Sequence, residues 1–253
     1  MTNKLNIDID EFLNSGFDLK KHLSDYLGLS HQSLETHLSK GLKELSVLHP
    51  GSFRKEDINA FYEVKVGTRH LLELANWHLQ SASYIADTLR LQKMFARGNV
   101  LDFGGGIGTH SLAASLLPDV EHVYFVDLNP ENRAFVKQRV QELGVGKYVS
   151  IYRDLDSITN IKFDTVICLD VLEHLPNPSA QLLEFKNRLT LESVALMNWY
   201  FFKGNNGEYP FHVDDKEIVQ EFFLTLQTNF IEIFHPLLIT TRAYRPLNVT
   251  KEI

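Results

Sequence analysis

The feature that most constrains the fold is an alternation, from residue 98 onward, of short β-branched and aromatic runs with segments of helical length. The runs that resemble strands are residues 100–103, 123–126, 148–152, 163–169 and 194–197. Strands that alternate with helix-length segments are typical of βαβ units, in which successive strands lie parallel and helices cover the sheet. The sequence therefore predicts an α/β fold with a doubly wound, mostly parallel sheet.

The C-terminal end predicts an antiparallel addition to this sheet. Residues 229–234 and 237–244 flank His235-Pro236, and we expect two strands joined by a tight connection. With the five runs above they give a seven-stranded, Rossmann-like sheet whose final strand is antiparallel.

The first part of the chain has a different periodicity. Apolar residues in 10–97 recur at helical spacing, as in Leu71, Leu72, Ala75 and Leu79. We therefore divide the chain into an N-terminal helical cap, residues 1–97, and a ligand-binding domain, residues 98–253. The cap is longer than the bare fold needs, so we expect it to pack over the open crevice of the sheet.

A glycine-rich loop follows the first predicted strand. Its sequence is Asp102-Phe103-Gly104-Gly105-Gly106-Ile107-Gly108, and a plausible helix comes next. Glycines let the backbone turn sharply and lie against a ligand, while the helix N-terminus offers free amides. A nucleotide-like ligand fits this loop. The dinucleotide fingerprint has its third glycine where this chain has Thr109, so NAD is the poorer fit.

The chain from about residue 98 to 245 resembles the class I S-adenosylmethionine-dependent methyltransferases. The resemblance implies that Asp102 lies near the methionine amino group and that Gly104, Gly106 and Gly108 pack against the cofactor. It also implies that Asp127, which ends the second strand before Leu128, accepts both ribose hydroxyls. A carboxylate has two acceptor oxygens and so suits a cis-diol.

Two later segments extend this resemblance. Asp154, followed by Leu155, matches the acid that often reaches the adenine amine in the family. Residues 169–176, which include Asp170, resemble the segment where the chain of many small-molecule methyltransferases passes the methionine moiety and borders the acceptor pocket. The resemblance implies S-adenosyl-L-methionine as the cofactor and a small molecule as the acceptor.

Few residues qualify as a catalytic base. His174 follows the fourth strand and titrates near neutrality, although it equally suits a structural role in the turn before Pro176. Residues 199–215 resemble a lid over the acceptor, which makes His212 and Tyr209 the alternative base and positioning group. Against this, residues 212–215 suit the cap of a helix that begins near residue 216.

Other polar and aromatic residues of the cap have simpler interpretations. Its aromatic residues and one histidine could line the pocket but are more typical of core: Phe61, Tyr62, Trp77, His78 and Tyr84. Four further histidines lack metal-ligand spacing, so we expect no metal site: His22, His31, His37 and His49. Cys168 lies among apolar residues and is most simply a small buried hydrophobe.

Composition narrows the class of partner. The 32 acidic and 25 basic residues give a net charge of −7, which argues against nucleic acid or an anionic membrane as a partner. The single cysteine and the acidic start of the chain favour a cytoplasmic protein, and a homodimer is compatible with the sequence.

The glycine loop does not decide what is transferred. Methyl transfer to a small molecule is the main hypothesis. The alternatives are transfer of the aminocarboxypropyl arm or cyclisation, both of which release methylthioadenosine, and a non-catalytic module that binds S-adenosylmethionine.

Overall fold

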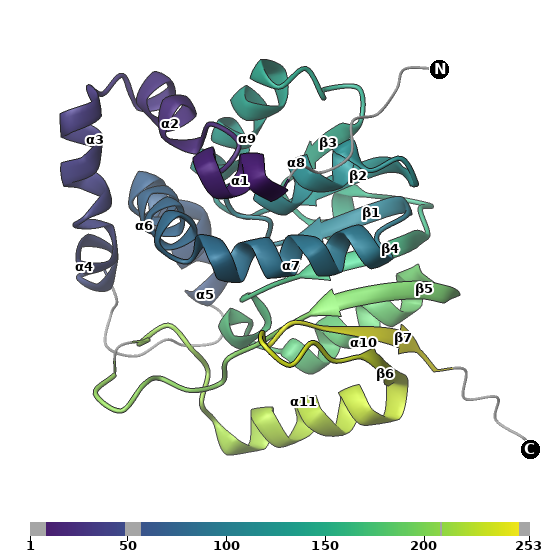
Figure 1. The fold of residues 1–253 in the computed structure, drawn as a ribbon. Coiled ribbons are helices and arrows are strands. Elements are labelled where there is room, and N and C mark those ends of the chain that lie inside the picture. Colours follow the sequence, from purple (N-terminus) through teal and green to yellow (C-terminus); the bar gives the residue numbers. More distant parts are fainter. Residues whose placement is uncertain (1–8, 49–56, 208, 248–253) are drawn as a thin grey trace, which may run out of the picture.

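The computed structural model describes residues 9–48, 57–207 and 209–247, and it contains one seven-stranded sheet in the order β3-β2-β1-β4-β5-β7-β6 (Figure 1). The strands are β1 Gly98–Phe103, β2 Val120–Val126, β3 Val149–Tyr152, β4 Phe163–Cys168, β5 Leu189–Met197, β6 Phe230–Phe234 and β7 Arg242–Pro246. Strands β1 to β5 pair in parallel, whereas β7 pairs antiparallel with both β5 and β6. The predicted mostly parallel sheet with an antiparallel final strand is confirmed.

The connection between β6 and β7 differs from the prediction. The sequence placed a strand at 237–244, but β7 begins only at Arg242, so residues 235–241 form the connection. Leu237 is 93% exposed and Leu238 is 87% exposed, so neither side chain packs on the sheet. The apolar residues 237–239 therefore led the sequence analysis to start this strand too early.

Helices cover both faces of the sheet. The helices that pack around it are α7 Ala82–Phe95, α8 Thr109–Leu116, α9 Pro130–Glu142, α10 Pro178–Arg188 and α11 Lys216–Asn229. Neighbouring residues of β1 point to opposite faces, because Val100 lies in a core cluster with residues of α7, α8 and α9, whereas Leu101 lies in one with residues of α10 and α11. The fold is therefore a three-layer α/β/α arrangement.

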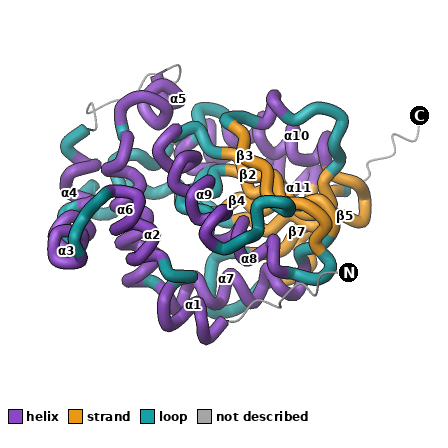
Figure 2. The backbone as a smooth tube through the Cα atoms, turned by 90° about the horizontal axis from the view of Figure 1, so that it is seen from above, coloured by secondary structure: helices purple, strands orange, loops and turns teal. Residues whose placement is uncertain are grey.

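The N-terminal region is helical, as predicted. Its helices are α1 Ile9–Ser15, α2 Leu19–Leu27, α3 His31–Leu38, α4 Gly41–Ser46, α5 Ile58–Ala60, a π-helical turn Phe61–Lys65, and α6 Gly67–Gln80. Figures 1 and 2 show α2, α3, α4 and α6 gathered beside the edge of the sheet at which the parallel strands end. A separate core cluster joins α2, α3 and α6 to Ile107 of the glycine loop and Phe135 of α9.

The topology positions the ligand crevice. Strands β2 and β3 lie on one side of β1, and β4 and β5 lie on the other. In open α/β sheets, ligands bind outside the carboxyl ends of the strands at the point where the strand order reverses. Here that point lies between the segments that follow β1 and β4. Among the described residues, none of the helices is long and apolar enough to cross a lipid bilayer.

Candidate functional site

The glycine loop turns at the carboxyl end of β1. Gly104 has a φ of +69° and Gly106 a φ of +55°, a region that favours glycine. A Cβ atom on Gly104 would lie 2.4 Å from Cγ2 of Val171, so the loop could not approach the segment after β4 with any larger residue. A Cβ on Gly106 would meet only the tip of Leu74 at 3.0 Å, and its other neighbour is 4.0 Å away. On the side where a Cβ of Gly106 would stand, the nearest neighbour is therefore one flexible side chain.

Asp127 lies at the carboxyl end of β2, beside this loop, and is 7% exposed. Its Oδ2 accepts a hydrogen bond from the amide of Gly106 at 2.9 Å, and its Oδ1 accepts one from the amide of Asn129 at 2.8 Å. The side-chain amide of Asn132 reaches both oxygens at 3.3 Å. The two backbone bonds fix the carboxylate, and the longer contact to Asn132 is the one that a hydroxyl could replace.

Asp102 occupies the end of β1 and is 3% exposed. The hydroxyl of Ser111 donates to its Oδ2 at 2.6 Å. Burial raises the pKa of Asp102 to about 7, and the charge of Asp127 adds to this shift. Burial also raises the pKa of Asp127 to about 6. Two neighbouring carboxyl groups with raised pKa values favour a ligand that carries positive charge.

The segment after β4 brings further acids to the same edge. Asp170 adopts a φ of +54°, and its amide donates to Oδ1 of Asn198 at 2.6 Å. Glu173 is 1% exposed, and its Oε1 accepts a hydrogen bond from the amide of Tyr200 at 3.1 Å. Burial raises the pKa of Asp170 to about 6 and, together with the charge of Asp170, that of Glu173 to about 8.

Helix α6 of the cap lies across the glycine loop and the end of β2. Besides Leu74, its residue His78 lies with Nδ1 3.2 Å from the hydroxyl of Thr109. The carbonyl of Gly67 accepts a hydrogen bond from the side chain of Asn129 at 3.0 Å. His70 approaches Asn132 at 3.4 Å. Helix α6 therefore contacts both the glycine loop and the segment that follows β2.

Arg139 on α9 holds the beginning of the cap to the loop. Its guanidinium is fully buried and donates to the carbonyl of Ile107 at 2.9 Å. It also donates to the carbonyls of Gly16 at 2.9 Å and Phe17 at 3.0 Å. Because these carbonyls come from two distant segments, one side chain joins the turn between α1 and α2 to the glycine loop.

Asp154, the candidate for the adenine amine, makes local contacts. Its Oδ1 accepts hydrogen bonds from the amide of Ser157 at 3.0 Å and its hydroxyl at 2.6 Å, which caps a short 3₁₀ helix. Oδ2 pairs with Arg153, which also pairs with Glu63 of the cap at 2.6 Å. The hydrogen bonds from Ser157 and Arg153 lower the pKa of Asp154.

The three candidate catalytic residues lie together. The rings of His174 and His212 are 4.8 Å apart between centroids, and Tyr209 stacks on His212 at 5.1 Å. Nδ1 of His174 lies 3.0 Å from the hydroxyl of Tyr62 in the cap. Burial lowers the pKa of His174 to about 3, with a further contribution from His212. A general base works best with a pKa near the working pH, so this shift weakens His174 in that role.

The loop between β5 and α11 also caps the N-terminus of α11, which is the alternative role that the sequence analysis gave to residues 212–215. Asp215 caps α11, because its Oδ1 accepts hydrogen bonds from the amides of Glu217 at 3.0 Å and Ile218 at 3.2 Å. Asp214 instead pairs with Lys203 at 3.1 Å. The residue that caps the N-terminus of α11 is therefore Asp215 and not His212, whose ring faces His174.

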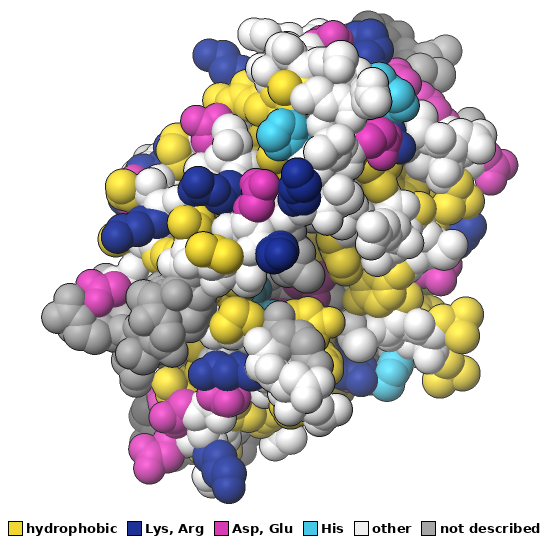
Figure 3. Space-filling view, turned by 90° about the vertical axis from the view of Figure 1, so that its left-hand side faces the viewer, with side chains coloured by type: hydrophobic (Ala, Val, Ile, Leu, Met, Phe, Trp, Pro, Cys, Tyr) yellow, Lys and Arg dark blue, Asp and Glu magenta, His cyan; other side chains and the backbone are white. Residues whose placement is uncertain are grey.

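Other predicted residues have structural positions. Leu128 follows Asp127 and its carbonyl accepts a hydrogen bond from Arg133 at 2.7 Å, while Leu155 and Cys168 are buried in the core beneath α10. Of the N-terminal histidines, His22 is buried beside Arg139. His49 lies outside the described residues. Figure 3 shows the face at which the parallel strands end, with a hollow bordered by hydrophobic side chains and acidic and histidine side chains within it.

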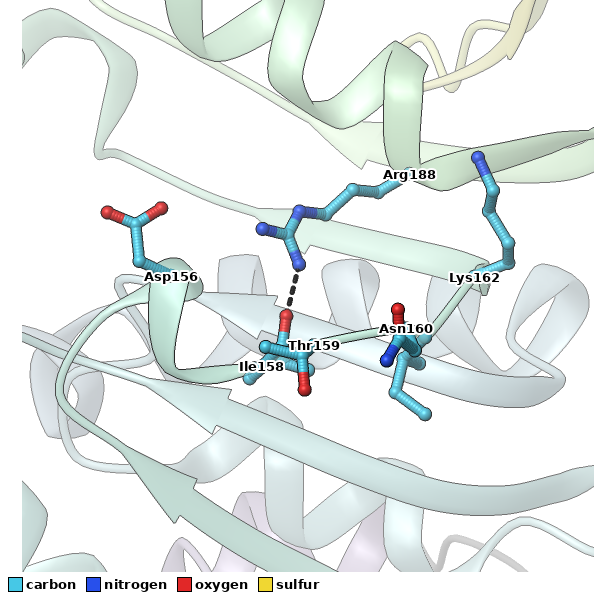
Figure 4. Close-up of a pocket in the computed structure, with 7 residues that line it drawn as sticks. Asp156, Ile158, Thr159, Asn160, Lys162 and Arg188 are labelled. Carbon is cyan, nitrogen blue, oxygen red and sulfur yellow. Dashed lines mark hydrogen bonds between the residues drawn. The ribbon is translucent and has the colours of Figure 1, made fainter.

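A separate surface groove lies near the opposite edge of the sheet, beside the start of β4. Its volume is about 520 Å³, and Figure 4 shows the side chains that line it. The lining residues are Asp156, Ile158, Thr159, Asn160, Ile161, Lys162 and Arg188. Arg188 donates across the groove to the carbonyl of Ile158 at 2.5 Å. The groove contains none of the predicted site residues.

Sequence reasoning missed several residues of the site. Leu74 and His70 are ordinary positions of an amphipathic helix, and only the docking of α6 brings them to the loop. Asn132 lies on α9, one turn after the Asn129-Pro130 start, and this spacing could have linked it to Asp127. Glu173 was inside a segment that the sequence singled out, but nothing local indicated its burial.

A comparison with known protein families identifies the domain that contains this site. Residues 77–197 match the family described as a methyltransferase domain. They form a methyltransferase domain. The protein is an S-adenosylmethionine-dependent methyltransferase, with S-adenosylmethionine as its cofactor. The match runs from α6 to the end of β5, so it includes the loop, Asp127 and the segment after β4.

Solved structures show the same fold. The protein PH0226 from Pyrococcus horikoshii is 16% identical, with a TM-score of 0.52 over 78% of this chain and 100% of that chain. A geranyl diphosphate methyltransferase in complex with GPP and sinefungin is 12% identical, with a TM-score of 0.51 over 71% of this chain and 82% of that chain. None of the curated proteins compared with the sequence matches it.

The site of the methyltransferase domain fits its cofactor chemically. S-adenosylmethionine carries an ammonium group and a sulfonium, and the carboxyl groups of Asp102, Asp127 and Asp170 gather at one edge of the sheet. Where a Cβ of Gly106 would stand, the nearest atom is the movable tip of Leu74, at 3.0 Å. When bound, the cofactor supplies an electrophilic methyl group.

Proposed function

We propose that this methyltransferase acts on a small-molecule acceptor, held between the cap and the loop that follows β5. Asp102, the loop of Gly104, Gly106 and Gly108, and Asp127 hold the cofactor. Leu128, Asp154, Leu155 and Asp170 complete its surroundings in this proposal. These are the residues that the resemblance to class I enzymes singled out, and the proposal is supported by Asp102, Asp127 and Asp170, which lie at or after the carboxyl ends of three neighbouring parallel strands.

One observation supports the small acceptor above all: the cap and the loop after β5, which are distant in sequence, contact each other beside the candidate catalytic residues. Phe61 of the cap packs on Phe211 of the loop after β5, with ring centroids 5.6 Å apart. The neighbouring Tyr62 places its hydroxyl 3.0 Å from Nδ1 of His174. A direct contact between the cap and the loop after β5 restricts access to this side of the site and so favours a small acceptor, whereas a folded nucleic acid needs an open and positively charged surface.

The side chains of this pocket determine what the chain itself contributes. Methyl transfer requires the acceptor to be aligned with the methyl group and water to be excluded. The aromatic rings of Tyr62, Tyr209 and Phe211 supply an apolar wall that excludes water. Tyr209 and His212 contact the acceptor from the loop, and His174 contacts it from the floor.

The test follows the methyl group. The protein is incubated with S-adenosylmethionine labelled at the methyl carbon and a cell extract, which is then separated into low-molecular-mass, protein and RNA fractions. We expect label in the low-molecular-mass fraction together with S-adenosylhomocysteine. Label in RNA or protein would refute the small-molecule acceptor. Methylthioadenosine in place of S-adenosylhomocysteine would show that another group of the sulfonium reacts.

A further inference from the structure

Three ligand-type side chains converge on the acceptor side of the site. One oxygen of Glu173 and one ring nitrogen each of His174 and His212 lie within 4.8 Å of one another. Glu173 and His174 belong to the 3₁₀ turn after β4, Leu172–His174, and His212 belongs to the loop before α11. Within the described residues this is the one group with such geometry.

The carboxylate of Glu173 lacks the partners that its burial demands. Its side chain is 1% exposed, and Oε1 accepts one hydrogen bond from the amide of Tyr200. Oε2 is buried and, among the described residues, has no hydrogen-bond partner. A buried carboxylate oxygen without a donor is unfavourable unless a proton or a cation accompanies it. This oxygen therefore points to a missing partner.

Each imidazole has a backbone carbonyl beside its Nδ1. Nδ1 of His174 lies 3.3 Å from the carbonyl of Phe211 and 3.0 Å from the hydroxyl of Tyr62, and Nδ1 of His212 lies 3.0 Å from the carbonyl of Phe202. A carbonyl only accepts, so the bond to it requires a proton on Nδ1, from which the oxygen of Tyr62 can also accept, and the lone pair of the neutral ring is then at Nε2. A metal-binding histidine commonly donates its other N–H to a backbone carbonyl in this way.

We propose that Glu173, His174 and His212 bind one divalent transition-metal ion of the Zn²⁺ or Mn²⁺ kind. Two imidazoles and a carboxylate favour such ions over Mg²⁺ and Ca²⁺, which prefer oxygen ligands. Ligand atoms at about 2.1 Å from an ion are roughly 3.0 to 3.5 Å from each other, so the cluster must contract by about an ångström. The half-buried ring of His212 lies on a loop, and we expect it to make most of that movement.

The ion would have a task in methyl transfer. Three protein ligands leave coordination positions open, and an oxygen of the acceptor can occupy one of them. The ion would then align the acceptor and lower the pKa of its hydroxyl. This task rests on the proposed function, whereas binding of the ion does not.

The experiment measures metal binding without any acceptor. The whole protein is treated with EDTA, freed of chelator and titrated with Mn²⁺, with the free ion followed by electron paramagnetic resonance. We expect one Mn²⁺ per chain, displaced by Zn²⁺ but not by a large excess of Mg²⁺. Glu173→Gln and His212→Ala should each weaken Mn²⁺ binding by about tenfold or more.

The control is His235→Ala, because His235 pairs with Glu232 at 3.3 Å on the surface and should not affect the bound ion. Failure of the wild-type protein to bind one Mn²⁺, or binding that neither variant weakens, would overturn the proposal. If Glu173→Gln fails to fold, His212→Ala decides alone. Binding of S-adenosylhomocysteine is measured on the same samples, so loss of cofactor binding, which concerns the methyltransferase function, is distinguished from loss of metal binding.

Discussion

The substitution Asp102→Asn tests whether burial in the cofactor crevice makes the charged form of Asp102 unfavourable. Asp102 is 3% exposed, and its nearest described donor is the hydroxyl of Ser111. Asparagine has nearly the same shape and can still accept that hydrogen bond through its amide oxygen. The substitution therefore removes the titratable proton and changes little else.

The expected magnitude follows from the pKa of this group. Burial raises the pKa of Asp102 from 3.8 to about 7, so the folded protein holds a proton that the unfolded chain has already released. The free energy of unfolding that this group contributes is therefore present at low pH and lost as the pH rises through about 7. At 1.4 kcal/mol per pKa unit the full loss is ~4 kcal/mol, of which about 2 kcal/mol falls between about pH 5.5 and pH 8.

The assay is urea unfolding of the cofactor-free protein at these two pH values. We expect the stability of Asp102→Asn relative to the wild type to rise by about 2 kcal/mol from the lower to the higher pH. The difference between the two pH values cancels any fixed cost of the substitution. Asp119→Asn, at an exposed position, is the control. A relative stability of Asp102→Asn that stays constant with pH would refute the burial of an uncharged acid at the end of β1.

Three further perturbations separate the parts of the site. Asp127→Ala should weaken S-adenosylhomocysteine binding by about tenfold to a hundredfold in calorimetry, because the ribose hydroxyls lose their acceptor, and an unchanged affinity would contradict this role. Gly106→Ala should abolish that binding while the protein still folds. Its control Gly144→Ala has a similar φ of +67° and nothing within 4 Å of the added Cβ, so it should retain binding. Arg139→Met should lower the free energy of unfolding by about 3 to 5 kcal/mol, since three buried carbonyls lose their donor, and a thermal shift near zero would show that the cap is held by other contacts.

The sheet and the cofactor loop could be predicted because local chemistry determines them. Asp102, Gly104 and Asp127 stand at strand ends, and parallel strands bring their carboxyl ends to one edge whatever the side chains elsewhere. The Asn129-Pro130 pair starts α9 as such a pair should, with the Asn129 side chain accepting from the amide of Glu131 at 3.0 Å. Each of these features depends on residues close together in sequence.

The contacts of the cap could not be predicted in this way. Leu74 lies on α6 and meets Gly106 more than thirty positions later in the chain, and Arg139 joins carbonyls of the turn between α1 and α2 to a carbonyl of the glycine loop. Helical periodicity shows which face of α6 is apolar, but not which surface that face covers. For the same reason, Glu173 and His212 could not be paired, because the path of the loop after β5 brings them together.

Cofactor binding and the position of the cap are therefore coupled through a few contacts. A ligand that lies against Gly106 has to displace Leu74, and α6 carries Leu74 on the same rigid element as Gly67, whose carbonyl holds Asn129. A shift of α6 would weaken that contact, and the side chain of Asn129 lies 3.4 Å from Asn132, which contacts the carboxylate of Asp127 that would hold the ribose. Arg139 keeps the start of the cap fixed to Ile107 during such a shift, so α6 can move without release of the whole cap. Because Phe61 and Tyr62 directly precede α6, the same movement adjusts the wall of the acceptor pocket, and cofactor binding should thus alter the affinity for the acceptor.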